Sequence, residues 1–166
     1  QQEPISAMSM KAVVVGAGGI SGAWFPNLKE EGVEVAGIVD LDQARAQAQA
    51  GKFGLSPLIS SDLKATLRRV KPDFVVDLTP PDHHCAVTCA ALKAGCHVIG
   101  EKPMAASMAQ ARRMVAAADA ATSDRLRGLP AVHRSWSPPP PARGVGTATH
   151  RYARRTMREQ WSDFFL

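Results

Sequence analysis

The sequence predicts an α/β fold, a doubly wound parallel sheet that extends over residues 10–121. Short apolar runs of strand length alternate with helix-like segments of about ten or more residues, a pattern typical of parallel strands joined by crossover helices. A glycine-rich turn follows the first apolar run, and an acid, Asp40, closes the second. Together these features predict a ligand site where the strands end.

The stretch 10–40 predicts a dinucleotide-binding unit of the Rossmann type. Gly16 permits a tight turn after the strand 12–15, and Gly18 removes a side chain where the backbone must approach a pyrophosphate. Asp40 follows Gly18 by about 20 residues, the spacing of an acid that binds the adenosine ribose hydroxyls. The alternative is an ordinary glycine-rich turn without a ligand, but the strand, helix and acid around it favour a dinucleotide site. The turn residues expected to bind it are Gly16, Gly18, Gly19, Ile20 and Ser21.

The chain after Asp40 keeps alternating between helices and strands. Capping residues mark the helix starts: Ser60 or Ser61 for one helix, Asp82 for the next and Ser107 for the last. The expected elements are a helix at 41–51, a very short strand at 58–59, a helix with apolar positions 63, 67 and 70, a strand at 73–78, a helix that Gly95 ends, a strand at 96–100 and a helix at 107–121.

Four segments converge on the carboxyl ends of these strands, where ligands bind in such sheets. They are the glycine turn, Asp40, the segment 79–84 (Thr-Pro-Pro-Asp-His-His) and the segment 101–103 (Glu-Lys-Pro). With the sequence 90–98, these motifs resemble the N-terminal half of the glucose-fructose oxidoreductase, inositol dehydrogenase and rhizopine-catabolism (Gfo/Idh/MocA) family. The resemblance covers about residues 10–121, and the Glu-Lys-Pro signature is its most specific part.

The resemblance implies a fold, a cofactor and site residues. It implies that Lys102 is catalytic and stabilises an alkoxide as hydride leaves the substrate. Trp24 stands where many family members have histidine or tyrosine. The cofactor is expected to be NAD rather than NADP, because the Asp40 carboxylate would repel a 2'-phosphate. The further residues expected to contact the cofactor are Thr79, Pro80, Pro81, His84, Glu101 and Lys102.

Charge and cysteine content limit the function classes. The net charge is +5, but residues 1–120 are balanced and the whole excess lies in 121–166, so the domain has no basic face for nucleic acid. Three cysteines within 85–96 argue against a disulfide framework and favour a reducing, cytoplasmic location. Cys85 and Cys89 have a spacing that could bind metal, but they lack a second ligand pair, so no metal is expected. No run of about 20 apolar residues predicts a membrane span.

The ends of the sequence differ from its centre. Residues 1–9 are expected to be a disordered N-terminus, and residues 122–166 an irregular Arg/Pro-rich tail with four consecutive prolines. Three explanations compete for the tail: a truncated gene product, a displaced reading frame, or a basic interaction segment. Its histidines, His133 and His150, lie where the sequence shows no framework to fix them. The family's second domain, which supplies a general base, has no visible counterpart there.

The leading function is a nicotinamide-dinucleotide-binding domain of an oxidoreductase that acts on CH–OH groups of sugars, polyols or related compounds, incomplete for catalysis. The expected partners are the dinucleotide and, in the full-length family, a small hydroxylated substrate; a homo-oligomer stays open. The competing class is a non-catalytic module that senses NAD or binds a partner. Nucleic-acid binding through the arginine tail is a weaker third hypothesis, which the salt dependence of binding would separate from the others.

Overall fold

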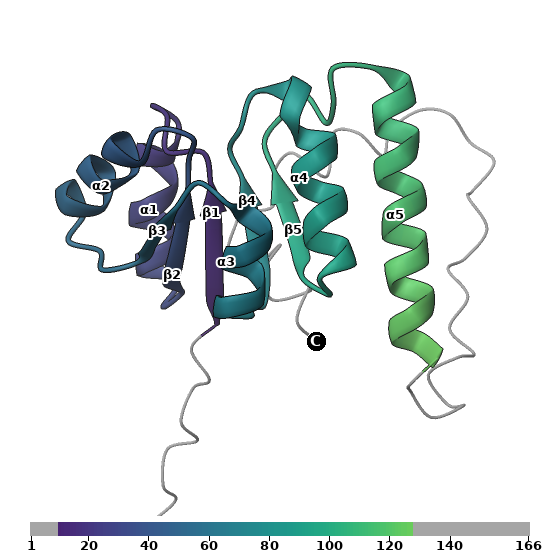
Figure 1. The fold of residues 1–166 in the computed structure, drawn as a ribbon, viewed down its shortest axis with the longest axis horizontal. Coiled ribbons are helices and arrows are strands. Elements are labelled where there is room, and N and C mark those ends of the chain that lie inside the picture. Colours follow the sequence, from purple (N-terminus) through teal and green to yellow (C-terminus); the bar gives the residue numbers. More distant parts are fainter. Residues whose placement is uncertain (1–9, 128–166) are drawn as a thin grey trace, which may run out of the picture. The chain divides into compact units, whose positions relative to one another are not determined.

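The computed structural model describes residues 10–127, which form an α/β domain (Figure 1). The predicted N-terminal disorder and the Arg/Pro-rich tail lie outside these residues, apart from the last turns of the final helix. The strands are β1 (Lys11–Val15), β2 (Glu34–Val39), β3 (Leu58–Ser60), β4 (Phe74–Asp77) and β5 (His97–Gly100). The helices are α1 (Ser21–Glu30), α2 (Gln43–Lys52), α3 (Leu63–Val70), α4 (Pro81–Lys93) and α5 (Met108–Arg127).

The strands form one parallel sheet in the order β3-β2-β1-β4-β5, which confirms the predicted doubly wound architecture. β1 pairs with β2 on one side and with β4 on the other. The chain therefore leaves β1 in one direction and returns to its other side after β3. This reversal is the topological switch point, the place where open α/β sheets bind their ligands.

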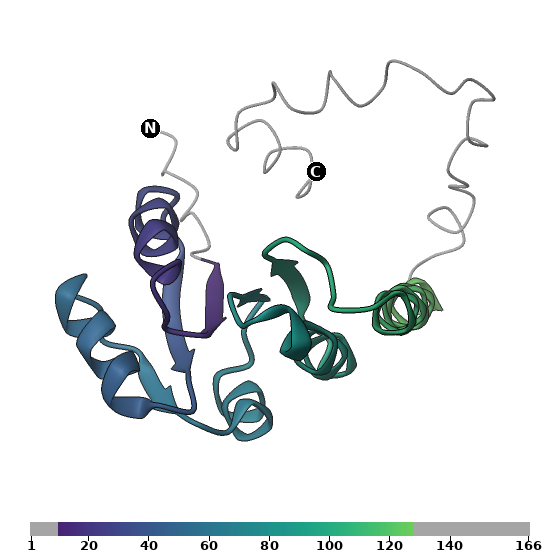
Figure 2. The same ribbon diagram turned by 90° about the horizontal axis from the view of Figure 1, so that it is seen from above.

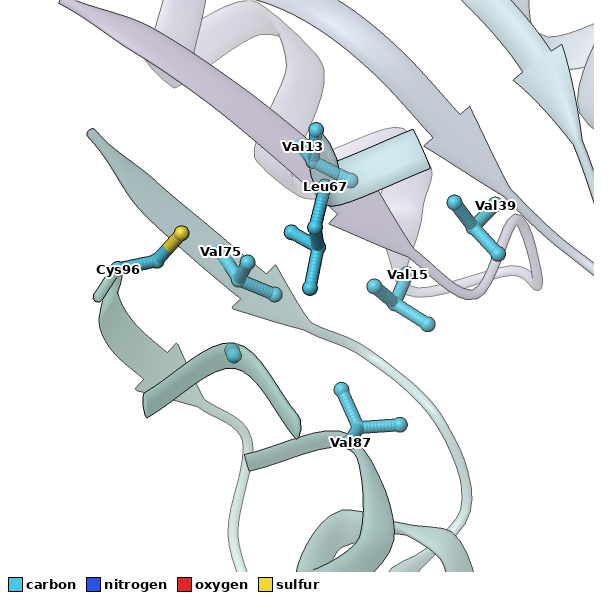
Figure 3. Close-up of a cluster of buried hydrophobic side chains, with 8 residues drawn as sticks. Val13, Val15, Val39, Leu67, Val75, Val87 and Cys96 are labelled. Atoms are coloured by element: carbon cyan, nitrogen blue, oxygen red, sulfur yellow. The ribbon is translucent and has the colours of Figure 1, made fainter. Parts of the chain in front are cut away.

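Helices cover both faces of the sheet, with α1 on one face and α3 and α4 on the other (Figure 2). Because both faces are covered, residues 12–15 of β1 are all buried, and the strand is an unbroken apolar run. Side chains from three strands, α3 and α4 meet in one apolar cluster (Figure 3). Its buried members are Val13, Val15, Val39, Leu67, Val75, Val87, Ala91 and Cys96. Each buried valine or leucine contributes about 1.5–3 kcal/mol to folding.

Several helix boundaries differ from the sequence prediction; α2, for example, is Gln43–Lys52 rather than 41–51. Asp62, rather than Ser60 or Ser61, caps α3, since its Oδ1 accepts the Ala65 N–H at 2.9 Å. Asp82 does not cap α4: the helix already starts at Pro81, whose missing N–H costs nothing at the first helical position. α5 continues past 121 to Arg127, the last residue that the structure describes.

Candidate functional site

A cavity of about 580 Å³ lies at the carboxyl ends of β1, β2 and β4, at the switch point. Its size is typical of small-molecule sites. Among the predicted site residues, Gly16, Gly18, Asp40, Thr79 and Pro80 line it. Three further polar residues line it that the sequence prediction did not include: Arg45, Ser61 and His83.

Glycine occupies the positions of the turn after β1 for different structural reasons. Gly16 has φ +96°, and a Cβ added there would lie 2.8 Å from the carbonyl oxygen of Leu78, so the fold itself requires glycine. A Cβ added at Gly18 or Gly19 would meet no atom of the described chain within 4 Å. The fold therefore does not demand glycine at these two positions. Ser21 is fully buried and donates its hydroxyl to the Gly18 carbonyl at 2.6 Å, which explains the need for a small residue there.

The helix that follows the turn starts without a side-chain cap. Ile20 occupies the N-cap position of α1, where its apolar side chain cannot accept a hydrogen bond. That side chain is about half exposed. No side chain at the N-cap thus competes with an anion for the helix start, a position that favours phosphate groups.

Asp40 ties the end of β2 to the glycine turn. Its Oδ2 accepts the Ala17 N–H at 2.7 Å, and its Oδ1 accepts the Asp42 N–H at 2.8 Å. Arg45 Nη2 also donates to Oδ1, at 3.2 Å. The sequence prediction considered only the residues next to Asp40 and missed Arg45, which the first turn of α2 brings back to the carboxylate. The N-cap residue Asp42 was the available signal, since it marks where that helix begins.

His84 lies away from this cavity and joins two segments of backbone. Its side chain is 2% exposed, with Nε2 2.6 Å from the carbonyl oxygen of Thr79 and Nδ1 3.0 Å from that of Pro103. The ring thereby connects the end of β4 to the turn after β5, which carries a cis peptide bond between Lys102 and Pro103. His84, Glu101 and Lys102 line a second cavity of about 500 Å³ beside α4 and α5.

Trp24, which stands where many family members have histidine or tyrosine, contacts the segment that follows β5. Its indole Nε1 donates to Oε1 of Glu101 at 2.8 Å, and Oε2 of Glu101 accepts the Lys102 N–H at 3.4 Å. The tryptophan on α1 therefore reaches the turn after β5. Pro81 is the first residue of α4, next to Thr79 and Pro80 at the end of β4.

Asp77 is a buried acid that the sequence prediction did not single out. Its Oδ1 accepts both the N–H of Thr79, at 3.1 Å, and the hydroxyl of Thr79, at 2.6 Å. Its Oδ2 has no hydrogen-bond partner among the described residues. Burial raises the pKa of Asp77 above its ordinary value, and the hydrogen bonds from Thr79 and the nearby charges of His84 and His83 only partly oppose this effect.

We expect the stability of the domain to depend on pH through Asp77. Because its folded-state pKa lies above the unfolded value, its favourable contribution is complete below the unfolded pKa and is lost as pH rises through the folded pKa. Asp77→Asn removes this charge. In urea titrations, the free energy of unfolding of the variant minus that of the unchanged chain should therefore increase from pH 4 to pH 8. Asp82→Asn, in the exposed first turn of α4, is the matched control. Parallel curves for Asp77→Asn and the unchanged chain would refute this role.

Two other expectations concern metal and membrane. Within residues 10–127, no group of three or more histidine, cysteine, aspartate and glutamate side chains is placed to hold a metal ion. Cys85 and Cys96 are buried core residues, whereas Cys89 is partly exposed. None of the helices in the described part is both long and apolar enough to cross a bilayer.

The family model for an oxidoreductase family with an NAD-binding Rossmann fold, GFO_IDH_MocA, matches residues 10–124. The chain belongs to this Gfo/Idh/MocA family. The D-glucoside 3-dehydrogenase of Escherichia coli (strain K12) is 33% identical over 112 residues, which are 66% of this chain and 32% of the relative. The chain thus spans about a third of the length of the curated relatives it matches.

Solved structures of oxidoreductases with a similar fold agree with this assignment. The WlbA dehydrogenase from Bordetella pertussis, solved with NADH and UDP-GlcNAcA, has a TM-score of 0.63 and 29% identity, covering 69% of this chain and 35% of that one. A variant of KijD10, a 3-ketoreductase from Actinomadura kijaniata solved with TDP-benzene and NADP, has a TM-score of 0.60 and 29% identity, covering 68% and 36%. The chain therefore contains a Rossmann domain for NAD, as the sequence predicted.

Proposed function

We propose that this domain holds NAD across the carboxyl ends of β1, β2 and β4, within an oxidoreductase that acts on a CH–OH group of a sugar, polyol or related compound. The observation that carries the proposal is the contrast within the glycine turn. Gly16 is required by the fold, whereas Gly18 and Gly19 border open space. The open space at Gly18 and Gly19, in the wall of the cavity at the switch point, leaves room for a ligand such as a pyrophosphate to approach the main chain.

The surrounding side chains fit a dinucleotide. Asp40 lies at the end of β2 in the cavity wall, where its carboxylate can accept hydrogen bonds from ribose hydroxyls. Thr79 and Pro80 form the opposite wall, on the β4 side of the switch point, and Pro81 follows them as the first residue of α4. Glu101 and Lys102 follow β5, the strand that lies next to β4 in the sheet. When bound, the nicotinamide would accept the hydride.

Lys102 is the proposed catalytic residue. Its side chain is exposed at the end of β5, so the ammonium can reach a substrate hydroxyl and stabilise negative charge on that oxygen. The turn that carries it is fixed from two sides, by Trp24 through Glu101 and by His84 through the Pro103 carbonyl. We therefore assign His84 and Trp24 positioning roles rather than direct roles in the chemistry.

The substrate class rests on the relatives. One relative is named for a glucoside, the WlbA dehydrogenase was solved with UDP-GlcNAcA, and an inositol 2-dehydrogenase from Salmonella typhimurium matches over 112 residues. These compounds are all rich in secondary hydroxyl groups, the groups that an NAD-dependent dehydrogenase oxidises. A small polyhydroxylated substrate is accordingly the proposed partner of the Lys102 ammonium.

His84 and Glu101, two candidate acceptors for the hydroxyl proton beside Lys102, are already engaged by other groups of the described domain. Both ring nitrogens of His84 face backbone carbonyls, and both carboxylate oxygens of Glu101 already accept hydrogen bonds within residues 10–127. We infer that this domain binds cofactor but is incomplete for catalysis. The same observation supports the second candidate function, a non-catalytic module that binds NAD as a sensor or with a partner.

Calorimetric titration of the purified chain with NADH and NADPH tests the proposal. We expect NADH to bind more tightly, because the Asp40 carboxylate favours ribose hydroxyls over a 2'-phosphate. Asp40→Ser should weaken NADH binding about tenfold or more, since a hydrogen bond to a charged acceptor contributes about 1.5–3 kcal/mol, and should narrow the preference for NADH.

The control for this titration is Asp73→Ser, because Asp73 precedes β4 and lies at the amino ends of the strands, away from the cavity. It should leave both affinities unchanged. Tighter binding of NADPH than of NADH by the unchanged chain would contradict the assigned role of Asp40. Absence of binding of either dinucleotide would contradict the proposed function as a whole.

A further inference from the structure

Both ring nitrogens of His84 face oxygen atoms that accept hydrogen bonds and cannot donate them. Nε2 lies 2.6 Å from the carbonyl oxygen of Thr79, and Nδ1 lies 3.0 Å from that of Pro103. A neutral imidazole has one N–H, so it can donate to one carbonyl while its other nitrogen turns a lone pair toward the second oxygen. An imidazolium has two N–H groups and donates to both. The 2.6 Å contact is also short for a neutral donor and typical of a charged one.

An imidazolium at this position needs a negative partner. The His84 side chain is 2% exposed, so water cannot solvate its charge. The ring also lies in the first turn of α4, where the helix dipole disfavours a positive charge. A nearby anion must therefore balance the proton.

Asp77 is the one buried acid among the described residues. Its Oδ1 accepts the N–H and the hydroxyl of Thr79, the residue whose carbonyl contacts His84. Burial raises the pKa of Asp77, and the positive charge of His84 is among the effects that oppose this rise. Asp77, Thr79 and His84 thus form a continuous buried chain of polar groups.

The other charged groups around His84 are exposed or already paired. Glu101 accepts hydrogen bonds at both carboxylate oxygens. The exposed groups are Asp82 and His83 on α4, Lys102 after β5 and Asp119 on α5. Water solvates their charges, so Asp77 is the group best placed to balance a buried imidazolium.

We propose that Asp77 is a positioning residue for Lys102, and that it acts by holding His84 as an imidazolium. The doubly protonated ring joins the end of β4 to the turn after β5 through two donated hydrogen bonds, and this turn carries Lys102. A neutral ring keeps one of the two bonds and holds the turn less firmly. The inference rests on the proposed function, because it assumes that Lys102 acts on a substrate hydroxyl.

Nuclear magnetic resonance of the isotope-labelled chain, without cofactor, tests this inference. We expect both ring nitrogens of His84 to carry protons at pH 7.5, where an ordinary histidine is mostly neutral. His84→Gln identifies the ring signals by their loss. The carbon signal of the Asp77 carboxyl group should show an ionised carboxylate at the same pH. A His84 ring with one unprotonated nitrogen, or a neutral Asp77, would overturn the inference in the unchanged chain itself.

Asp77→Asn then tests the link between the acid and the ring. Asparagine keeps an oxygen that can accept from Thr79 but removes the charge. We expect one ring nitrogen of His84 to lose its proton at pH 7.5, a change that loss of packing alone would not cause. The Lys102 amide hydrogen should exchange about tenfold faster, the factor for one lost hydrogen bond.

The matched control is Asp119→Asn, which makes the same change at an exposed acid of the same cavity and should leave both readouts unaltered. A His84 ring that stays doubly protonated in folded Asp77→Asn would contradict the role of Asp77. These measurements need no cofactor. A neutral His84 ring in a chain that binds NADH therefore overturns the inference alone, whereas a chain that binds no dinucleotide overturns the proposed function.

Discussion

Gly18→Val is expected to abolish dinucleotide binding while the domain stays folded. A Cβ at this position meets no described atom within 4 Å, so the valine can be accommodated by the protein itself. It would, however, occupy the space through which a pyrophosphate approaches the turn and the start of α1. Losing two charge-assisted hydrogen bonds at about 1.5–3 kcal/mol each weakens binding by more than about a hundredfold. Calorimetry with NADH measures the loss, and circular dichroism measures the fold.

Two other glycines provide the controls for this experiment. Gly51, in α2, also has open space around its Cβ, so Gly51→Val should leave both fold and binding unchanged. Gly16→Val should instead destabilise the domain, because its Cβ would press on the Leu78 carbonyl and its φ of +96° strains any other residue. Normal NADH binding by a folded Gly18→Val variant would show that the glycine turn has no role in the cofactor site.

The purified chain is expected to produce no NADH above background when it is given NAD and a panel of inositols, hexoses and sugar acids. Typical enzymes turn over at about 1–1,000 per second, so the expected deficit is several orders of magnitude. Oxidation of an alcohol needs a base for the hydroxyl proton, and a base displaced by about 1 Å can lose about a hundredfold in rate. In residues 10–127, His84 and Glu101 are already bound to other groups. His133 and His150 lie outside the described residues.

Absorbance at the NADH band, recorded with chain whose NAD binding has first been verified, measures this turnover. Verified binding makes the absence of product informative, since a misfolded sample is then ruled out. Robust turnover that disappears in Lys102→Ala would contradict the inferred incompleteness. It would show that residues beyond 10–127, or a second copy of the chain, supply the base.

Part of the fold and the site was predictable from the sequence because the signals are local. The unbroken apolar run at 12–15 predicts a strand, which the structure shows as β1, and Gly95, with φ +84°, ends α4 where the sequence places the helix end. Helix starts were less reliable. Serine and aspartate compete for the same cap, and at the start of α3 the carboxylate of Asp62 accepts the N–H while Ser60 Oγ accepts the N–H of Asp62 itself.

By itself, the sequence determined the order of strands and helices, the glycine turn and the acid at the end of β2, since each depends on residues close together in the chain. The tertiary structure decided which polar groups meet. Trp24 reaches Glu101 across 77 positions, and His84 joins Thr79 to Pro103 across the ends of β4 and β5. It also decided that Asp77 is buried with one oxygen unpaired among the described residues. Such contacts depend on how the strands are ordered in the sheet. No local pattern of residues shows which residues far apart in the chain that order brings together.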